Sequence, residues 1–268
     1  MKYLILVGDG MGDYPLAEQQ HKTPLELAKT PYIDALCARG ELFFNQTVPP
    51  GFPPGSDVAN MSLMGYNPGL YYTGRAPLEA AAMGIELGDD QYAFRCNMVT
   101  LEHRINTIIM DDFSAGHISS EEARLLIADI EKECGSELFS FRPGVSYRNL
   151  MLFSGEPLGF TTEPPHDHIG KDVTELFQRY LQIPVWKELL EKIGKILKQH
   201  PVNKRRQQQG KKPCNMFWLW GEGKKPQMPL ITEQYGISGT MISAVDLLKG
   251  IGVMAGLATP DIVGATGY

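Results

Sequence analysis

The apolar run from Tyr3 to Val7, which ends at Gly8-Asp9-Gly10, constrains the fold more than any other feature of the sequence. A short run that is apolar on both faces and closed by glycine is typical of a central parallel strand covered by helices. The run is shorter than the apolar core of a secretion signal, and no other stretch approaches the roughly 20 apolar residues of a membrane span. The sequence therefore predicts an α/β protein without a membrane segment.

Length, charge and cysteine content narrow the class of protein. The chain has 268 residues, enough for one large or two modest domains. A formal net charge of −6 argues against a protein that coats nucleic acid. The four cysteines lie far apart and form no C-x-x-C pair, so their spacing suggests neither a compact disulfide framework nor a ribbon-type zinc site. We therefore expect a protein of the reducing cytoplasm.

The pattern of apolar residues predicts two domains. An α/β domain of residues 1–88 and 213–268 is interrupted by an α+β insertion at 89–212. Thr23 caps a first helical stretch that closes at Gly40 and is broken or kinked at Pro31. Further helices are predicted at 119–135, 184–200 and 245–254, and strands at 92–100, 106–110, 138–141, 146–153, 215–221 and 240–244.

Two residues of the first domain have the surroundings of a reactive site. Asp9 follows the first predicted strand, and α/β proteins place their sites at that edge of the sheet. The proline-rich segment 48–55 delivers the chain to Ser56 at a helix N-terminus, where unpaired N–H groups stabilise an alkoxide or a phosphate. The alternatives are an ordinary strand-ending turn for Asp9 and an ordinary capping serine for Ser56.

Basic residues and histidines of the insertion indicate an anion site. Nine lysines and arginines lie between residues 187 and 212 against two glutamates. A solvated helix face explains most of the lysines but fewer of the arginines. Four other arginines lie beside glycine, proline or a short strand, where a guanidinium can clamp a phosphate or carboxylate: Arg75, Arg95, Arg142 and Arg148. His166 and His168 have the spacing of metal ligands on a strand, although polar loop residues are the alternative.

With these residues in hand, the sequence resembles the archaeal-type 2,3-bisphosphoglycerate-independent phosphoglycerate mutases of the alkaline phosphatase superfamily. The matching segments lie at 8–13, 54–60, 72–80, 93–97, 112–116, 143–148, 165–170, 218–221 and 264–268. The resemblance implies an α/β fold in which an alkaline-phosphatase-like sheet covered by helices is interrupted by a smaller α+β insertion domain. It also implies that the carboxyl-terminal part of the main domain is missing.

The resemblance implies a reaction through a phosphoserine. Ser56 would take the phosphoryl group from the substrate and return it to the other hydroxyl of the bound glycerate, which interconverts 2-phosphoglycerate and 3-phosphoglycerate in glycolysis and gluconeogenesis. Asp9 and Ser56 would be ligands of two divalent metal ions, manganese first, with zinc, cobalt or magnesium as alternatives. No 2,3-bisphosphoglycerate is needed.

The resemblance also assigns roles within the insertion domain. Arginines would hold the glycerate while it reorients, and two further residues are candidates for proton transfer or positioning. The substrate-binding candidates are Arg75, Arg95, Arg148 and Arg206, and the proton-transfer candidates are Asp112 and His166. The expected ligand is a small phosphoglycerate, with no nucleic acid and no membrane as partner.

Two departures from the family pattern carry expectations of their own. His117 stands where family members usually have arginine, which is expected to weaken or relocate one substrate contact. The chain ends at Tyr268, whereas the family continues into a region that supplies most of the metal ligands. We therefore expect a mutase chain without a complete two-metal centre, prone to self-association or completed by a second chain. The alternatives are a noncatalytic phosphoanion-binding fragment and another metal-dependent phosphomutase or phosphohydrolase of the same superfamily.

Overall fold

The chain forms two units, which meet in the sequence between Met64 and Gly65. The computed structural model describes residues 2–265, so residues 266–268 of the matching segment 264–268 lie outside the described residues. In this described range no helix is long and apolar enough to cross a bilayer.

The first unit contains short helices joined by extended chain. Thr23 caps the first α-helix with its side chain, and Glu26 completes the capping box. The predicted break at Pro31 is confirmed, because one helix ends before that proline and the next begins on it. The elements are η1 (Ala17–Gln19), α1 (Pro24–Leu27), α2 (Pro31–Cys37) and α3 (Ser56–Leu63).

The strand predicted at the amino terminus is absent from the structure. Tyr3, Leu4 and Leu6 are extended but are 74%, 89% and 85% exposed, and the described part of the first unit contains no strand. An isolated strand leaves its backbone N–H and C=O groups without partners, so apolar residues alone do not form one. The expectation of a buried parallel strand at this position was therefore wrong for this structure.

The second unit is built on a mixed α/β arrangement with an antiparallel sheet. The hydrogen-bonded path through the sheet is β2-β1-β4-β3. Strand β5 lies off this path and also pairs with β1. The strands are β1 (Tyr92–His103), β2 (Ile108–Asp112), β3 (Phe139–Val145), β4 (Arg148–Phe153) and β5 (Met216–Gly223). Five of the seven strands predicted from the sequence are thereby confirmed.

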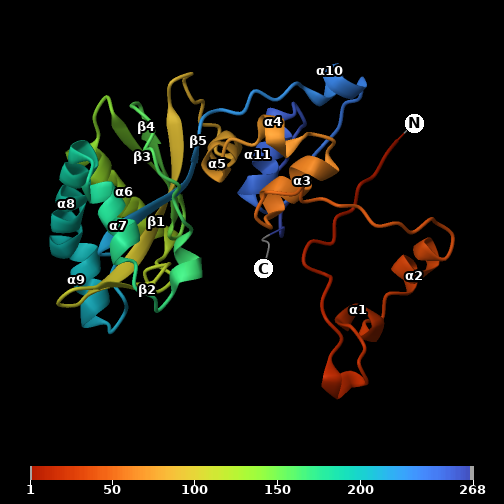
Figure 1. Cartoon of the computed structure of the whole chain (residues 1–268), viewed down its shortest axis with the longest axis horizontal. Coiled ribbons are helices and arrows are strands. Elements are labelled where there is room, and N and C mark those ends of the chain that lie inside the picture. The colour runs from red at the N-terminus through yellow and green to blue at the C-terminus, as the bar shows by residue number, and fades with distance from the viewer. Residues whose placement is uncertain (1, 266–268) are drawn as a thin grey trace. The chain divides into compact units, whose positions relative to one another are not determined.

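Helices pack against this sheet, as the ribbon in Figure 1 shows for α6, α7 and α8. Ser119 and Glu122 form the predicted capping box at the start of α6. The helices are α4 (Pro68–Tyr71), α5 (Arg75–Ala82), α6 (Ser120–Cys134), η2 (Pro165–His168), α7 (Thr174–Leu181), α8 (Pro184–Gln199), α9 (Pro201–Gln208), α10 (Ile231–Tyr235) and α11 (Asp246–Met254).

The two faces of β1 have different environments because successive side chains of a strand point in opposite directions. Phe94 and Met98 belong to the main apolar core, where the ring of Phe94 lies 5.3 Å from that of Trp186 on α8. Ala93 belongs to a second, smaller cluster with residues of α5, including Ala76. Helix α5 therefore packs against the face of β1 that carries Ala93, opposite to the face that carries Phe94 and Met98.

Two strand predictions need correction. The segment 215–221 forms a strand, but it pairs with β1 inside the sheet of the predicted insertion and not with a strand of the first domain. The predicted strand at 240–244 has one isolated bridge, between Thr240 and Ala258. Apolar sequence predicted burial of 215–221 correctly, whereas it could not identify the partner strand, which depends on contacts more than a hundred residues apart in the chain.

Replacing Gly250 by alanine is expected to destabilise the second unit, although alanine is the better helix former by about 1 kcal/mol. A Cβ atom at Gly250 of α11 would overlap the carbonyl oxygen of Leu78 on α5, and such overpacking costs about 1–3 kcal/mol. Urea unfolding followed by tryptophan fluorescence measures the change in the free energy of unfolding.

Gly194→Ala is the matched control for this experiment. At Gly194 of α8 the new methyl group would meet the terminal methyl of Met216 at 3.1 Å, and that flexible side chain can move. The control variant should be as stable as the wild type or more stable. A Gly250→Ala variant as stable as the control would contradict the close contact between α5 and α11.

Candidate functional site

Three of the predicted arginines lie together on the face of the sheet that α5 approaches. Arg95 of β1 pairs directly with Trp220 of β5 and with Leu150 of β4. Arg148 pairs with Asn97, two residues further along β1. The strand register and the alternation of side chains therefore place Arg95 and Arg148 on one face.

Glu79 of α5 holds two of these arginines at once. Its Oε1 accepts a hydrogen bond from Nε of Arg75 at 3.1 Å, and its Oε2 accepts one from Nε of Arg95 at 2.9 Å. The side chain of Arg95 is only 6% exposed, against 30% for Arg75. Burial lowers the pKa of Arg95 below its ordinary value, and the neighbouring charge of Arg75 acts in the same direction, while Glu79 opposes both.

Both guanidinium groups lie over the indole ring of Trp220. The guanidinium carbon of Arg95 lies 4.3 Å from the ring centroid, and that of Arg75 lies 5.8 Å from it. The next residue, Gly221, has a φ of 64°, and a Cβ atom there would lie 3.5 Å from Cβ of Arg75 and 3.7 Å from Cδ of Arg95. Glycine thus supplies the left-handed turn that this arrangement needs.

A small cavity of about 30 Å³ opens beside the arginines. Its polar lining includes Arg75, Glu79, Arg148 and Asn149, and the start of α11 closes it. The volume is sufficient for a water molecule. Basic and acidic groups therefore meet in one hollow of the second unit.

His166 lies at the edge of the same arrangement. Its ring centroid is 5.5 Å from that of Trp220 and 6.2 Å from that of Phe113. Partial burial lowers the pKa of His166 below 6.5; Arg95 and Arg75 lower it further, and Asp167 raises it in part. The imidazole is therefore neutral at pH 7 and able to accept a proton.

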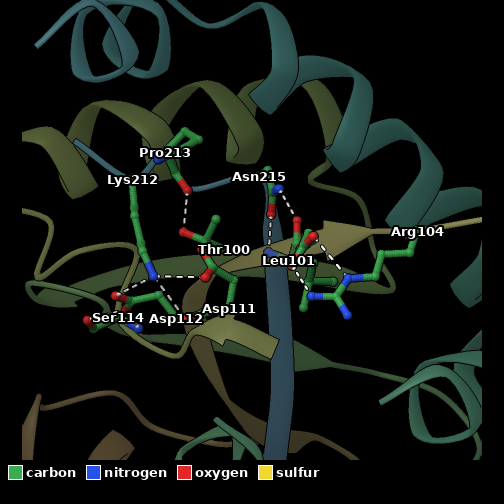
Figure 2. Close-up of polar contacts among 10 residues, drawn as sticks. Thr100, Leu101, Arg104, Asp111, Asp112, Ser114, Lys212, Pro213 and Asn215 are labelled. Atoms are coloured by element: carbon green, nitrogen blue, oxygen red, sulfur yellow. Dashed lines mark hydrogen bonds and ion pairs between the residues drawn. The ribbon is translucent and has the colours of Figure 1, made fainter. Parts of the chain in front are cut away.

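Asp112 organises the loop that follows β2, as Figure 2 shows. Its Oδ1 accepts hydrogen bonds from the Ser114 backbone N at 2.8 Å and from the Ser114 hydroxyl at 2.7 Å. Nζ of Lys212 donates to the carbonyl and the carboxylate of Asp111 and lies 3.9 Å from Oδ2 of Asp112. Burial raises the pKa of Asp112, but the hydrogen bonds from Ser114 and Gly116 and the charge of Lys212 outweigh it, so the net shift is downward. These contacts suit a carboxylate that shapes a loop better than one that transfers protons at neutral pH.

Arg206 is a buried clamp beneath that loop. Its side chain is 2% exposed and its Nη1 donates to Glu122 at 2.6 Å. The other donors reach backbone carbonyls: Nε that of Lys212 at 3.0 Å, and Nη2 that of Ala115 at 2.6 Å. The guanidinium is occupied by the protein itself, so the structure does not bring Arg206 together with the arginines at Trp220.

The clamped loop carries His117 at an exposed position. Ala115, Gly116 and His117 all have positive φ angles, of 49°, 64° and 49°, a strained arrangement for the two that are not glycine. The His117 ring lies 6.1 Å from the ring of Tyr147, and the guanidinium of Arg148 lies 5.6 Å from that same ring. His117 therefore stands close to the arginine face. The remaining candidate, Arg142, pairs instead with Glu131 of α6.

Asp9 and Ser56 belong to the first unit. Asp9 is exposed, in a turn outside any helix or strand, and Ser56 is exposed as the first residue of α3, directly after the N-cap Gly55. The prediction that Ser56 begins a helix is confirmed. Within residues 2–265 no group of three or more His, Cys, Asp and Glu could hold a metal ion. Asp9 and Ser56 alone do not make up the ligand set of a two-metal centre.

Sequence reasoning missed three residues of the arginine face: Glu79, Tyr147 and Trp220. Arg75 and Glu79 are four residues apart, a spacing that brings side chains together on a helix and could have indicated their ion pair. The contact between Glu79 and Arg95 had no such local signal, because it joins a helix to a strand.

Comparison with known proteins identifies the family. The sequence pattern of the 2,3-bisphosphoglycerate-independent phosphoglycerate mutases matches residues 37–203. A protein of that name from Methanosarcina barkeri is 50% identical over 271 residues, which cover 100% of this chain and 67% of the relative. The chain belongs to this family. A probable member from Geobacter sulfurreducens is 48% identical over 268 residues, again 67% of its length.

Solved structures agree with this assignment. A Pyrococcus horikoshii protein has a TM-score of 0.73 and 30% identity, with 97% of this chain and 61% of the other covered. A cofactor-independent phosphoglycerate mutase from Thermoplasma acidophilum has a TM-score of 0.51 and 28% identity, with 95% of this chain and 68% of the other covered. The chain thus spans about two thirds of the length of the family members that it matches.

Replacing Arg206 by methionine is expected to destabilise the second unit by about 3 kcal/mol, because Glu122 and the loop carbonyls lose a buried charged partner. Thermal unfolding followed by circular dichroism measures the loss. The neighbouring Arg205 is exposed, so Arg205→Met should leave the unfolding temperature unchanged. Equal effects of the two substitutions would show that Arg206 is not a structural clamp.

Proposed function

We propose that the second unit binds a phosphoglycerate through Arg75, Arg95 and Arg148, for the interconversion of 2-phosphoglycerate and 3-phosphoglycerate. The observation that carries this proposal is the arrangement of two guanidinium groups on one indole with a single carboxylate between them. Among the described residues, Glu79 alone bonds Arg75 and Arg95, and it takes only their Nε atoms. The Nη edges are left for an anion, and guanidinium edges bind phosphate and carboxylate in pairs of hydrogen bonds.

Ser56 is the proposed acceptor of the phosphoryl group. Its hydroxyl oxygen loses a proton and forms a bond to phosphorus, while the bond between phosphorus and the glycerate oxygen breaks and that oxygen takes up a proton. In the return step the other hydroxyl of the glycerate attacks the phosphoserine, and the Ser56 hydroxyl is restored. The position of Ser56 at the start of α3 supports this role, because the N–H groups of a first helical turn stabilise a phosphate.

His166 is proposed to accept and return the proton of a glycerate hydroxyl, which its neutral imidazole supports. Asp112 is proposed to position the loop that follows β2. The cytoplasm as the compartment belongs to this proposal as well, since Cys37, Cys96, Cys134 and Cys214 are all free thiols.

Replacing Arg75 by alanine is expected to weaken binding of 3-phosphoglycerate by roughly 10- to 100-fold, the value of a hydrogen bond between charged groups. Titration calorimetry measures the dissociation constant. Arg104 directly follows β1, the strand of Arg95, but pairs with Glu102 at an exposed position, so Arg104→Ala is the control and should bind as the wild type does. A wild type without measurable affinity, or equal losses in both variants, would contradict the proposed site.

Turnover separates the mutase from a chain that only binds phosphoanions. If the chain catalyses the interconversion, Ser56→Ala should abolish it and leave the dissociation constant of 3-phosphoglycerate within about twofold, because the arginines are untouched. Binding without turnover in the wild type, with manganese present, would leave only the binding function. A preference for sugar phosphates would favour another phosphomutase or phosphohydrolase.

Binding of the anion should raise the pKa of His166. The positive charges of Arg95 and Arg75 lower this pKa in the free protein, and a bound phosphate would neutralise their effect. NMR titration of the imidazole with and without 3-phosphoglycerate measures the shift, with uncharged glycerol as the control ligand. An unchanged or lowered pKa would place the bound anion elsewhere.

A further inference from the structure

The carboxylate of Glu79 lies in an unusual place for a site that is to receive an anion. Its side chain is 12% exposed, and each of its two oxygens bonds a different arginine. A negative charge there opposes a negative ligand, so Glu79 by its charge alone weakens the attraction that Arg75 and Arg95 exert. Its presence therefore needs a reason other than charge.

The two arginines reach Glu79 from different parts of the fold. Arg75 begins the same helix, α5, one turn before Glu79, whereas Arg95 comes from the middle of the sheet. Their positive charges are close enough to act on one another, since Arg75 lowers the pKa of Arg95. Without Glu79 this repulsion would drive the groups apart. Arg95 is buried and cannot leave, but Arg75 is 30% exposed and can swing into solvent.

We propose that Glu79 is a positioning residue, which holds Arg75 beside Arg95 so that both Nη edges are presented to one ligand. Glu79 accepts a hydrogen bond from the Nε atom of each arginine, which fixes both guanidinium planes on Trp220. The edge formed by the two Nη atoms of each guanidinium is then available to a ligand. A ligand with two anionic groups, such as a phosphoglycerate, gains from this more than a single small anion does. This inference rests on the proposed function and extends it to the choice of ligand.

The charge and the positioning effects of Glu79 have opposite signs, so two ligands distinguish them. In Glu79→Gln the loss of a negative charge tightens binding of every anion, inorganic phosphate included. The loss of positioning weakens only a ligand that needs both arginines. The informative quantity is the preference, which is the dissociation constant of inorganic phosphate divided by that of 3-phosphoglycerate. If part of the sample is unfolded, the apparent dissociation constants of the two ligands change by the same factor, so the preference does not change.

Titration calorimetry of the full chain with both ligands tests the proposal. We expect Glu79→Gln to lower the preference at least tenfold. Glu102→Gln is the matched control, because Glu102 of β1 also bonds an arginine, Arg104 just after the strand, but at 51% exposure and away from Trp220. Its preference should equal that of the wild type. An unchanged preference in Glu79→Gln, with both anions bound more tightly, would overturn the proposal and leave Glu79 a balancing charge.

Glu79→Asp supplies a test without a change of charge. Aspartate is shorter by one methylene group and cannot bond both Nε atoms from the same backbone position, so we expect a preference below that of the wild type. A wild-type preference in this variant would also overturn the positioning role. A wild type that binds 3-phosphoglycerate no better than inorganic phosphate would overturn the proposed function itself, and this inference with it.

Discussion

The pairing of β1 with β4 and β5 is the constraint on which the rest of the second unit depends. Antiparallel register puts Arg95 opposite both Trp220 and Leu150, and a shift of one residue would turn Arg95 into the apolar core. The same register keeps Phe94 against Trp186 of α8. One set of backbone hydrogen bonds thus decides at once which side chains build the core and which face α5.

Two arginines of this unit show how surroundings decide what a residue type does. Arg206 and Arg95 are both almost fully buried and both bond a glutamate. Backbone carbonyls of Lys212 and of Ala115, in the strained loop, accept hydrogen bonds from Nε and Nη2 of Arg206, so Arg206 supports the backbone. Arg95 instead stacks on an indole and shares its glutamate with a second arginine. Burial of a cation is therefore compatible with a structural or a ligand-facing role, and the partners of its outer nitrogens distinguish the two.

Local patterns in the sequence predicted the elements between residues 92 and 223 well, because caps and alternation act over a few residues. The capping box at Ser119 is an example, and the helix break at Pro31 is a local signal of the same kind in the first unit. Features that depend on distant partners were not predictable in this way. The run at Tyr3 lacks a neighbouring strand, the strand at 216–223 joined a different sheet from the one expected, and Arg206 met a loop about ninety residues away in the chain.

Arg75 and Arg95 share the single carboxylate of Glu79, so the arginine face has an excess of positive charge. This excess arises when α5 packs against the sheet during folding. The folded chain bears this repulsion whenever no ligand is present, and Trp220 and Glu79 relieve only part of it. An anion that binds removes the remainder and favours the folded form by mass action. If a phosphoglycerate binds at this face as proposed, ligand binding and folding are coupled there, and the concentration of the ligand contributes to the stability of the second unit.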